Sequence, residues 1–299
     1  MNDLSVQNTS VQNMTDKEPF KYALIIFTYG RPKKVYTVKS VRKAGYTGRI
    51  ILLLSDDDPT IEEYREQYKN EKDVFIRVFN KDSLIGTFDK MDNFGNMKVG
   101  VFARNYIPIL ARKLKLDGYV VFDDDYTGFH HRYTTDGKKL SYISVYDMDA
   151  VNDIMFDFLK DTGATTVAFA QGGDLIGGCN GSFLKGHKRK AMNSFYFLTD
   201  TEYEYSGTMN DDVNFYIDAS RQGAFILTTF GVSLVQVATQ ASDGGMTEFY
   251  KAMGTYVKSF YSVMRVPSAV TVSVMRGRLH HEIQSKYCMP QVIHEKYKK

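Results

Sequence analysis

Short apolar runs separated by turn residues dominate the first half of the chain. They are rich in β-branched and aromatic residues and resemble strands that are buried on both faces of a sheet. These predicted strands lie at residues 22–27, 49–54, 74–79 and 117–122. Helical patterns at 32–43 and 99–114 alternate with them, and Pro108 is expected to disturb the second helix. The alternation predicts an α/β sheet dominated by parallel strands.

The second half begins with an amphipathic helical pattern. Its predicted apolar face consists of Val151, Ile154, Met155, Phe158 and Leu159. Asp147 or Asp149 can cap the start of this helix, and Gly163 fits its end. Further strands are expected at 165–170 and 224–230, and a further helix at 211–222.

A late helix is expected from a second periodic pattern. Aromatic and methionine residues recur at helical spacing at Phe249, Met253, Tyr256, Phe260 and Met264. The simplest interpretation of this stripe is packing into the core.

Length and composition limit the domain organisation. The chain has 299 residues and is 43% hydrophobic, which is enough for one large core. Residues 1–19 are polar and are expected to form a disordered tail, so that 20–299 form a single domain.

Charge, cysteine content and hydropathy narrow the kinds of partner and compartment that the sequence predicts. A net charge of +3 does not by itself indicate a nucleic-acid partner. Two cysteines are too few for a disulfide framework and favour reduced thiols inside the cell. No run of about 18 apolar residues or secretory signal is present, so we expect no membrane association.

Three consecutive aspartates end the strand at 117–122. Because side chains alternate along a strand, Asp123 and Asp125 are expected to point one way and Asp124 the other. Two close carboxylates repel each other unless a cation lies between them, and Mg²⁺ or Mn²⁺ accepts oxygen ligands while keeping positions for phosphate. The alternative is an acidic turn of solvated aspartates. The pattern suggests a metal-held diphosphate where ligands bind in such sheets, at the carboxyl ends of the strands.

Other polar residues are expected at the same edge or near it. Thr28, Tyr29 and Arg31 follow the first strand and offer a hydroxyl, a ring and a guanidinium to a nucleotide. Asp56 follows the second strand and could face a ligand, although the acidic run 56–58 also reads as a helix start.

Three polar segments in the second half each have two interpretations. Asp211 and Asp212 open a helix, either as ordinary caps or as a general base that takes a proton from an acceptor hydroxyl. His280 and His281 stand beside arginines and could ligate a metal and contact a diphosphate, or belong to a solvated basic segment. The densest basic run contains Lys185, Lys188, Arg189 and Lys190 and could clamp a phosphate backbone, or be a solvated face.

Together these residues resemble a metal-dependent glycosyltransferase of the GT-A type, and more specifically the TET-associated glycosyltransferases of tailed phages. The resemblance covers nearly everything after the tail. It is carried by the blocks Phe27–Pro32, Lys43–Gly48, Asp92–Gly95, Ala103–Asn105, Phe122–Thr127, Arg189–Ser194, Asn210–Asn214, Gly244–Thr247, Gly254–Ser262 and His280-His281. One departure concerns the start of the catalytic helix, where the family usually has Glu before Asp and this chain has Asp211 before Asp212.

The resemblance implies a GT-A-like, Rossmann-like mixed sheet flanked by helices. It also implies transfer of a hexose or pentose from a nucleotide sugar, such as a UDP-sugar, to 5-hydroxymethylcytosine or another hydroxymethylated pyrimidine in phage DNA, in the cytoplasm of an infected bacterium. Asp125, with Asp123 and His280 or His281, would hold Mg²⁺ or Mn²⁺ on the diphosphate. The nucleotide sugar would be bound by Thr28, Tyr29, Arg31, Asp56, Arg104, Asp123 and Asp124.

The same resemblance assigns the acceptor side. Asp212 or Asp211 would activate the acceptor hydroxyl, and the basic run at 185–190 and the positive C-terminal segment would track DNA phosphates. Two alternatives stay open: the same fold acting on a protein, glycan or lipid acceptor, and a non-catalytic module that binds a nucleotide sugar or DNA. Neither the sugar nor the oligomeric state follows from the sequence.

Overall fold

In the computed structural model of the chain, the described residues are 18–93, 98–237, 246–275, 277–289 and 296. For residues 246–253 and 255 the description is limited to the backbone. The predicted tail, 1–19, lies outside the described residues except for its last two positions.

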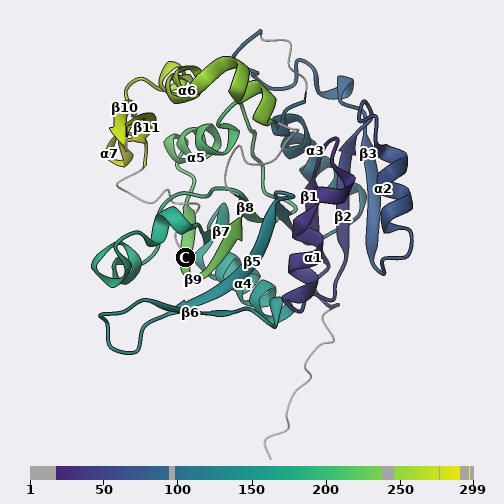
Figure 1. Cartoon of the computed structure of the whole chain (residues 1–299), viewed down its shortest axis with the longest axis horizontal. Helices are drawn as coiled ribbons and strands as arrows, with labels where there is room; N and C mark the ends of the chain where they lie inside the picture. Colours follow the sequence, from purple (N-terminus) through teal and green to yellow (C-terminus); the bar gives the residue numbers. More distant parts are fainter. Residues whose placement is uncertain (1–17, 94–97, 238–245, 276, 290–295, 297–299) are drawn as a thin grey trace, which may run out of the picture.

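A nine-stranded mixed sheet runs through the centre of the described structure (Figure 1). Its order is β3-β2-β1-β4-β8-β7-β9-β5-β6. The strands are β1 (Tyr22–Phe27), β2 (Ile50–Ser55), β3 (Val74–Phe79), β4 (Gly118–Phe122), β5 (Tyr126–Tyr133), β6 (Ser141–Ser144), β7 (Thr166–Ala170), β8 (Ser194–Leu198) and β9 (Ile226–Gln236). From β3 to β4 the strands are parallel, and β8 then pairs antiparallel with both β4 and β7.

Helices cover both faces of this sheet. They are α1 (Tyr36–Lys43), α2 (Ile61–Tyr68), α3 (Gly100–Lys113), α4 (Met148–Thr162), α5 (Asp211–Arg221), α6 (Met246–Arg265) and α7 (Ser285–Cys288). Alternate residues of β1 supply the two cores: Ile25 packs with α3 and α5 on one face, and Leu24 packs with α1, α2 and α4 on the other. The predicted fold class, a GT-A-like α/β sheet of mixed strands flanked by helices, is confirmed.

Most predicted elements are present, with three local corrections. The strands β5, β6 and β8 were not expected. The helix α3 continues through Pro108, although the sequence predicted a disturbance there. Ile154, expected on the buried face of α4, is 67% exposed, while Val151 and Met155 of that face are buried. Asp147 accepts a hydrogen bond from the Ala150 amide and caps α4, as one of the two predicted alternatives.

The late helix differs most from its prediction. Gly254 has φ +72°, a conformation that favours glycine, and it interrupts the helical backbone of α6. Tyr256, Phe260 and Met264 are 71%, 45% and 65% exposed, so their predicted role in core packing is wrong. Phe249 and Met253, the other members of the stripe, lie outside the described side chains.

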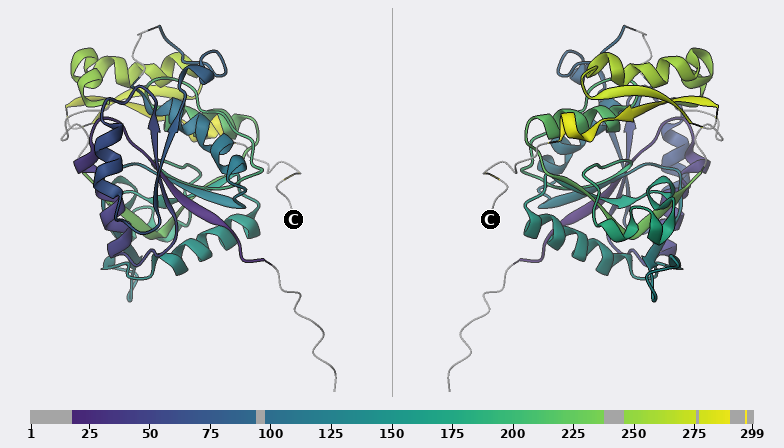
Figure 2. Two further views of the ribbon diagram at one scale, coloured as in Figure 1. Left: turned by 90° about the vertical axis from the view of Figure 1, so that its right-hand side faces the viewer. Right: turned by 90° about the vertical axis from the view of Figure 1, so that its left-hand side faces the viewer.

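An additional hairpin accompanies α6. Its strands are β10 (Val270–Met275) and β11 (Arg278–Ile283), which pair antiparallel. The hairpin lies along α6, and α6 lies beside α5 (Figures 1 and 2). Within the described ranges, no helix is long and apolar enough to cross a membrane. The two cysteines, Cys179 and Cys288, are buried and free.

Candidate active site

The carboxyl ends of the parallel strands bring the predicted polar residues to one edge. Phe27 pairs with Leu53, and Ile26 pairs with Phe122, so β1, β2 and β4 end side by side. Thr28 directly follows β1, and Asp56 directly follows β2. The three aspartates lie in the connection between β4 and β5.

A buried arginine joins this edge to the start of α5. Arg104 of α3 is only 4% exposed. Its Nη2 lies 3.0 Å from Oδ1 of Asp123, and its Nε lies 2.9 Å from Oδ2 of Asp211. The rings of Phe27 and Phe195 flank the guanidinium, with centroids 4.8 and 5.0 Å away. The residue predicted to bind a nucleoside therefore serves as a bridge between two carboxylates.

Electrostatics show how closely the bridge is balanced. Burial raises the pKa of both the Asp123 and the Asp211 carboxyl, and the Arg104 charge opposes that shift in each. Burial alone would lower the pKa of Arg104, but Asp211 and Asp123 raise it. The guanidinium therefore stays charged and compensates two partly buried acids.

We expect Arg104→Ala to reduce the free energy of unfolding by about 3–5 kcal/mol, because it leaves two carboxylates without their buried counter-charge. Urea unfolding at pH 7.5 measures this loss. Arg112→Ala, an exposed position on the same helix, is the matched control and should change stability by about 0.5 kcal/mol or less. Equal effects of the two substitutions would contradict the bridging role.

Asp124 points away from this bridge, as the alternation predicted. It is 3% exposed, and its Oδ2 accepts a hydrogen bond from Thr28 Oγ1 at 2.5 Å and lies 2.8 Å from Arg31 Nε. The Tyr64 hydroxyl completes the group at 2.9 Å from Thr28 Oγ1. Three predicted nucleotide-binding residues thus bind one another, and together they support the edge from behind.

Asp125 is the member of the triplet that best fits a cation. Burial, followed by the Asp124 charge, raises the pKa of its carboxyl to about 6, against the opposing charge of Arg31. Its Oδ1 is buried and has no hydrogen-bond partner among the described residues. A buried carboxylate oxygen without a partner is costly unless a ligand satisfies it.

The start of α5 places Asp212 next to the C-terminal hairpin. Burial lowers the pKa of His281 on β11 and of Lys258 on α6, and the Asp212 charge opposes both shifts. His281 was predicted as a metal ligand, whereas the strongest charged influence on it is Asp212. His280 occupies the preceding position of β11 and pairs with Ser273. In the described part of the chain, no group of three His, Cys, Asp or Glu side chains is arranged to hold a metal.

Helix α6 holds the turn that presents the two acids. Asn210 precedes them with φ +51°, and its Nδ2 donates to Lys258 O at 2.8 Å and to Ser262 Oγ at 3.2 Å. The Tyr261 hydroxyl accepts from the Thr208 amide at 2.9 Å. Sequence reasoning missed these roles of α6, although the segment 254–262 was among the blocks that carried the family resemblance.

Two predicted donor-side residues are accessible at the outer part of the edge. The Tyr29 hydroxyl donates to Asp57 O at 3.2 Å, and the Tyr29 side chain is partly exposed. Asp56 is exposed, and its Oδ1 accepts from the Lys81 amide at 3.1 Å. The ammonium group of the buried Lys81 pairs with Asp57, another contact that the sequence did not suggest.

The predicted DNA-binding run is partly neutralised within the protein. Lys188 Nζ and Lys190 Nζ lie 3.2 and 2.6 Å from Oδ1 of Asp174, which is 3% exposed. The Lys188 amide also pairs with Thr228 O of β9. Lys185 is exposed, and the Arg189 guanidinium lies 6.0 Å from the Phe225 ring. Two of the four predicted cations therefore have a structural partner.

For this reason the variant that tests DNA tracking is Lys185→Ala/Arg189→Ala, which leaves the Asp174 pairs intact. If each residue neutralises one phosphate, the slope of log affinity against log salt should fall by about 2. DNA binding across a salt series measures the slope. Lys138→Ala/Lys139→Ala removes two exposed charges from the β5–β6 connection and is the control. A slope that falls equally in both variants would indicate general charge, and an unchanged slope would identify a solvated run.

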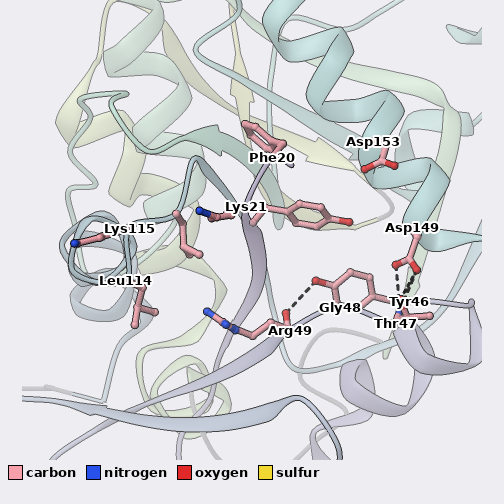
Figure 3. A pocket seen from close by; sticks show the side chains of 12 residues that line it. Phe20, Lys21, Tyr46, Thr47, Gly48, Arg49, Leu114, Lys115, Asp149 and Asp153 are labelled. Carbon is pink, nitrogen blue, oxygen red and sulfur yellow. Dashed lines mark hydrogen bonds between the residues drawn. The ribbon is translucent and has the colours of Figure 1, made fainter. Parts of the chain in front are cut away.

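A separate cavity of about 600 Å³ lies at the opposite, amino-terminal edge of the parallel strands (Figure 3). Phe20, Tyr22 and Tyr46 contribute to its lining. The Tyr46 hydroxyl donates to Arg49 O at 3.0 Å, and Asp149 accepts from the Thr47 amide and hydroxyl. Because the cavity contains none of the edge residues described above, it is not the candidate site.

Comparison with known proteins then identifies the family. The model of the TET-Associated Glycosyltransferase family matches residues 22–245, three quarters of the chain. The chain belongs to this family. The match contains the aspartate triplet, Arg104 and the two acids of α5. It ends before α6 and the hairpin, so the TET-associated glycosyltransferase match does not cover the segment that holds Asn210.

Solved structures give weaker likenesses. S. aureus TarS 1–349 has a TM-score of 0.42 at 12% identity, covering 78% of this chain and 63% of that chain. Glucosyl-3-phosphoglycerate synthase from Mycobacterium tuberculosis, in complex with Mn²⁺, UDP and glucosyl-3-phosphoglycerate, has a TM-score of 0.45 at 9% identity, covering 91% and 89%. The chain thus spans less than two thirds of the TarS chain it matches. No match was found among curated proteins.

Proposed function

We propose that this protein transfers a sugar from a nucleotide sugar to the hydroxyl of a hydroxymethylated pyrimidine in DNA. Family membership supports the glycosyltransferase activity, and the DNA acceptor is what the sequence resemblance implies. The observation that carries the proposal is the Arg104 bridge, which fixes the strand-end Asp123 and the helix-start Asp211 at one edge. The two remaining acids, Asp125 and Asp212, then divide between the donor and acceptor sides.

A divalent cation fits the donor side. Asp125 offers a buried oxygen that has no partner among the described residues, and the Asp125 charge contributes to the raised pKa of Asp123. Two carboxylates suffice, since Mg²⁺ is typically bound by one or two carboxylates together with substrate phosphates and water. When bound, Mg²⁺ or Mn²⁺ neutralises the charge that develops on the departing diphosphate. Asp125 would be its direct ligand, with Asp123 beside it.

The chain's own residues then have distinct tasks. Tyr29 and Asp56, accessible at the outer edge, would contact the nucleoside. Asp212 would take the proton of the acceptor hydroxyl while the hydroxyl oxygen bonds to the anomeric carbon of the sugar. At the same time the bond between that carbon and the diphosphate breaks, and its electron pair leaves with the diphosphate. Asp211, held by Arg104, would position Asp212. This division assigns the base to the second of the two acids that the sequence left open.

The test of this function is mass spectrometry of nucleosides from DNA containing 5-hydroxymethylcytosine, incubated with the protein and a panel of UDP-sugars. The mass gain identifies both the sugar and the acceptor. Unmodified DNA is the control, because it lacks the hydroxyl. Transfer to a protein, glycan or lipid without any transfer to DNA would replace the proposed acceptor. Absence of transfer to every acceptor, despite nucleotide-sugar binding, would favour a non-catalytic module.

A further inference from the structure

The solvent-facing side of α6 carries an unusual set of side chains. Tyr256, Phe260 and Met264 follow one another at intervals of four residues and therefore share one face of the helix. They are 71%, 45% and 65% exposed. On the opposite side, the described residues Ser259 and Ser262 are buried, at 3% and 0% exposed. We refer to Tyr256, Phe260 and Met264 as the outer face of α6.

This outer face lies one helix away from the proposed base. Asn210, immediately before the two acids, donates to Lys258 O at 2.8 Å, and Lys258 lies two residues from both Tyr256 and Phe260, on the opposite side of the helix from them. A helix with its side chains is about 10–12 Å across. An acceptor that reaches Asp212 and extends past the start of α5 would therefore meet α6.

The hairpin adds exposed groups beside this face. Ser259 Oγ donates to Leu279 O at 2.9 Å. Phe260 follows Ser259 in the sequence and Arg278 precedes Leu279, so both are sequence neighbours of this contact. Val274 and Met275 near the hairpin tip are 72% and 54% exposed, and Arg278 is exposed too. Aromatic, apolar and cationic groups therefore occur together on α6 and the hairpin.

Charge separates this segment from the rest of the chain. Residues 246–299 contain nine Lys and Arg against three Asp and Glu, a net charge of +6, whereas residues 1–245 have a net charge of −3. The excess of positive charge thus lies in the part of the chain that follows the family match. A polyanion is the partner that this charge distribution fits.

We propose that the outer face of α6 and the adjacent hairpin bind the polynucleotide acceptor, with bases stacking on Tyr256 and Phe260 and phosphates meeting exposed cations such as Arg278. This inference rests on the proposed DNA acceptor and adds the surface that receives it. Proteins that hold unstacked bases without sequence preference combine aromatic platforms with a positive surface in this way. Exposed aromatic side chains on a helix would otherwise favour aggregation or an unrelated partner.

The experiment compares wild type with Tyr256→Ala/Phe260→Ala. Fluorescence anisotropy measures affinity for an oligonucleotide containing 5-hydroxymethylcytosine, and a parallel titration measures affinity for the UDP-sugar. We expect DNA affinity to fall at least about tenfold, because each base stacked on an aromatic ring is worth about this much or more. UDP-sugar affinity should stay unchanged. The matched control is Tyr146→Ala/Ile154→Ala, which removes two side chains that are 74% and 67% exposed near the start of α4 and within it.

A second variant distinguishes stacking from apolar docking. Tyr256→Leu/Phe260→Leu keeps apolar area but removes the rings, so its DNA affinity should fall almost as far as that of the alanine variant. Tyr256→Phe/Phe260→Trp keeps both rings and should bind DNA like wild type. Thermal unfolding midpoints equal to that of wild type would show that all of these variants fold.

Several results would overturn the inference. If wild type glycosylates DNA and the alanine variant binds and modifies it equally well, the surface is wrong while the proposed function stands. If wild type neither binds nor glycosylates DNA, the proposed acceptor itself fails. Loss of binding to phosphatidylserine vesicles with unchanged DNA binding would assign the face to a membrane. A change from dimer to monomer in sedimentation, again with unchanged DNA binding, would assign it to a second copy of the chain.

Discussion

Asp212→Asn is expected to lower kcat by about 10²–10⁴-fold, with little change in affinity for the nucleotide sugar. That range is the usual contribution of a positioned general base. Asparagine keeps the shape of the side chain and can still bond the first turn of α5, where Asp212 Oδ1 accepts from the Val213 amide at 2.8 Å. Only the ability to take a proton is removed. Single-turnover rates with saturating UDP-sugar and hydroxymethylated DNA measure the chemical step directly.

Asp211→Asn is the matched comparison, because Asp211 is bound to Arg104. We expect this variant to lose stability, since the buried guanidinium keeps only Asp123 as a charged partner. Its single-turnover rate should fall less than that of Asp212→Asn. A larger loss of rate in Asp211→Asn would transfer the role of base to the first acid. If neither variant is slowed, the two residues are only the acidic start of a helix.

Asp125→Asn is expected to abolish activation by divalent cations and to make the metal-free protein more stable at neutral pH. The loss of activity follows because a metal's stabilisation of a leaving group is worth several kcal/mol, or at least about 10²-fold in rate. The gain in stability follows from the pKa. Burial raises the pKa of the Asp125 carboxyl from 3.8 to about 6, so the folded state favours the protonated form.

The sign of the pH dependence is therefore defined. The stabilising contribution of protonated Asp125 is complete below about pH 4 and is lost as the pH rises through about 6. At pH 7.5 in chelator, Asp125→Asn should exceed wild type by up to about 3 kcal/mol in free energy of unfolding, and at pH 4 the two should agree. Urea unfolding at both pH values measures this difference. Mn²⁺ should stabilise wild type and leave the variant unchanged. Full wild-type activity in excess chelator would contradict the metal role.

The donor edge was predictable from the sequence because two local rules determine it. Buried parallel strands appear as apolar runs, and their carboxyl ends share one edge, so Thr28 and the aspartate triplet were expected together. Alternation also predicted that Asp124 would point away from Asp123, and Asp124 contacts Thr28 and Arg31 whereas Asp123 contacts Arg104. The partners of these side chains did not follow from those rules. Arg104 and Asp211 come from separate helices, and their contacts with Asp123 depend on how α3 and α5 pack.

The errors on α6 have a different cause. Helical spacing indicates which side chains share a face, but it does not indicate which face is buried. The buried side includes Ser259 and Ser262, whose hydroxyls bond Leu279 O and Asn210, and these polar contacts are invisible in a hydrophobic pattern. The partner of the basic run was missed for a related reason, since Asp174, which pairs with Lys188 and Lys190, lies in the preceding glycine-rich loop.

The strands β5 and β8 were not predicted because their pairing with neighbouring strands, and not their own sequence pattern, determines their place in the sheet. Each pairs antiparallel inside the sheet, with β9 and β4 respectively; polar residues interrupt the sequence of β5, whereas β8 is a short aromatic run whose sheet position depends on its pairing with β4 and β7. β9 is longer than predicted because its pairing shifts register near Ser233, after which it continues alongside β5. Such pairings are set by tertiary structure, which overrides local preference.

The central claim is that the site containing Asp125 and Asp212 transfers a sugar to hydroxymethylated DNA. The most direct test measures the mass of 5-hydroxymethylcytosine nucleosides after incubation of the DNA with UDP-sugar and wild type, Asp125→Asn or Asp212→Asn. We predict a mass gain of one sugar with wild type in the presence of Mn²⁺ or Mg²⁺, and little or none with either variant. An equal gain with all three proteins, or a gain only on an acceptor other than DNA, would contradict the account.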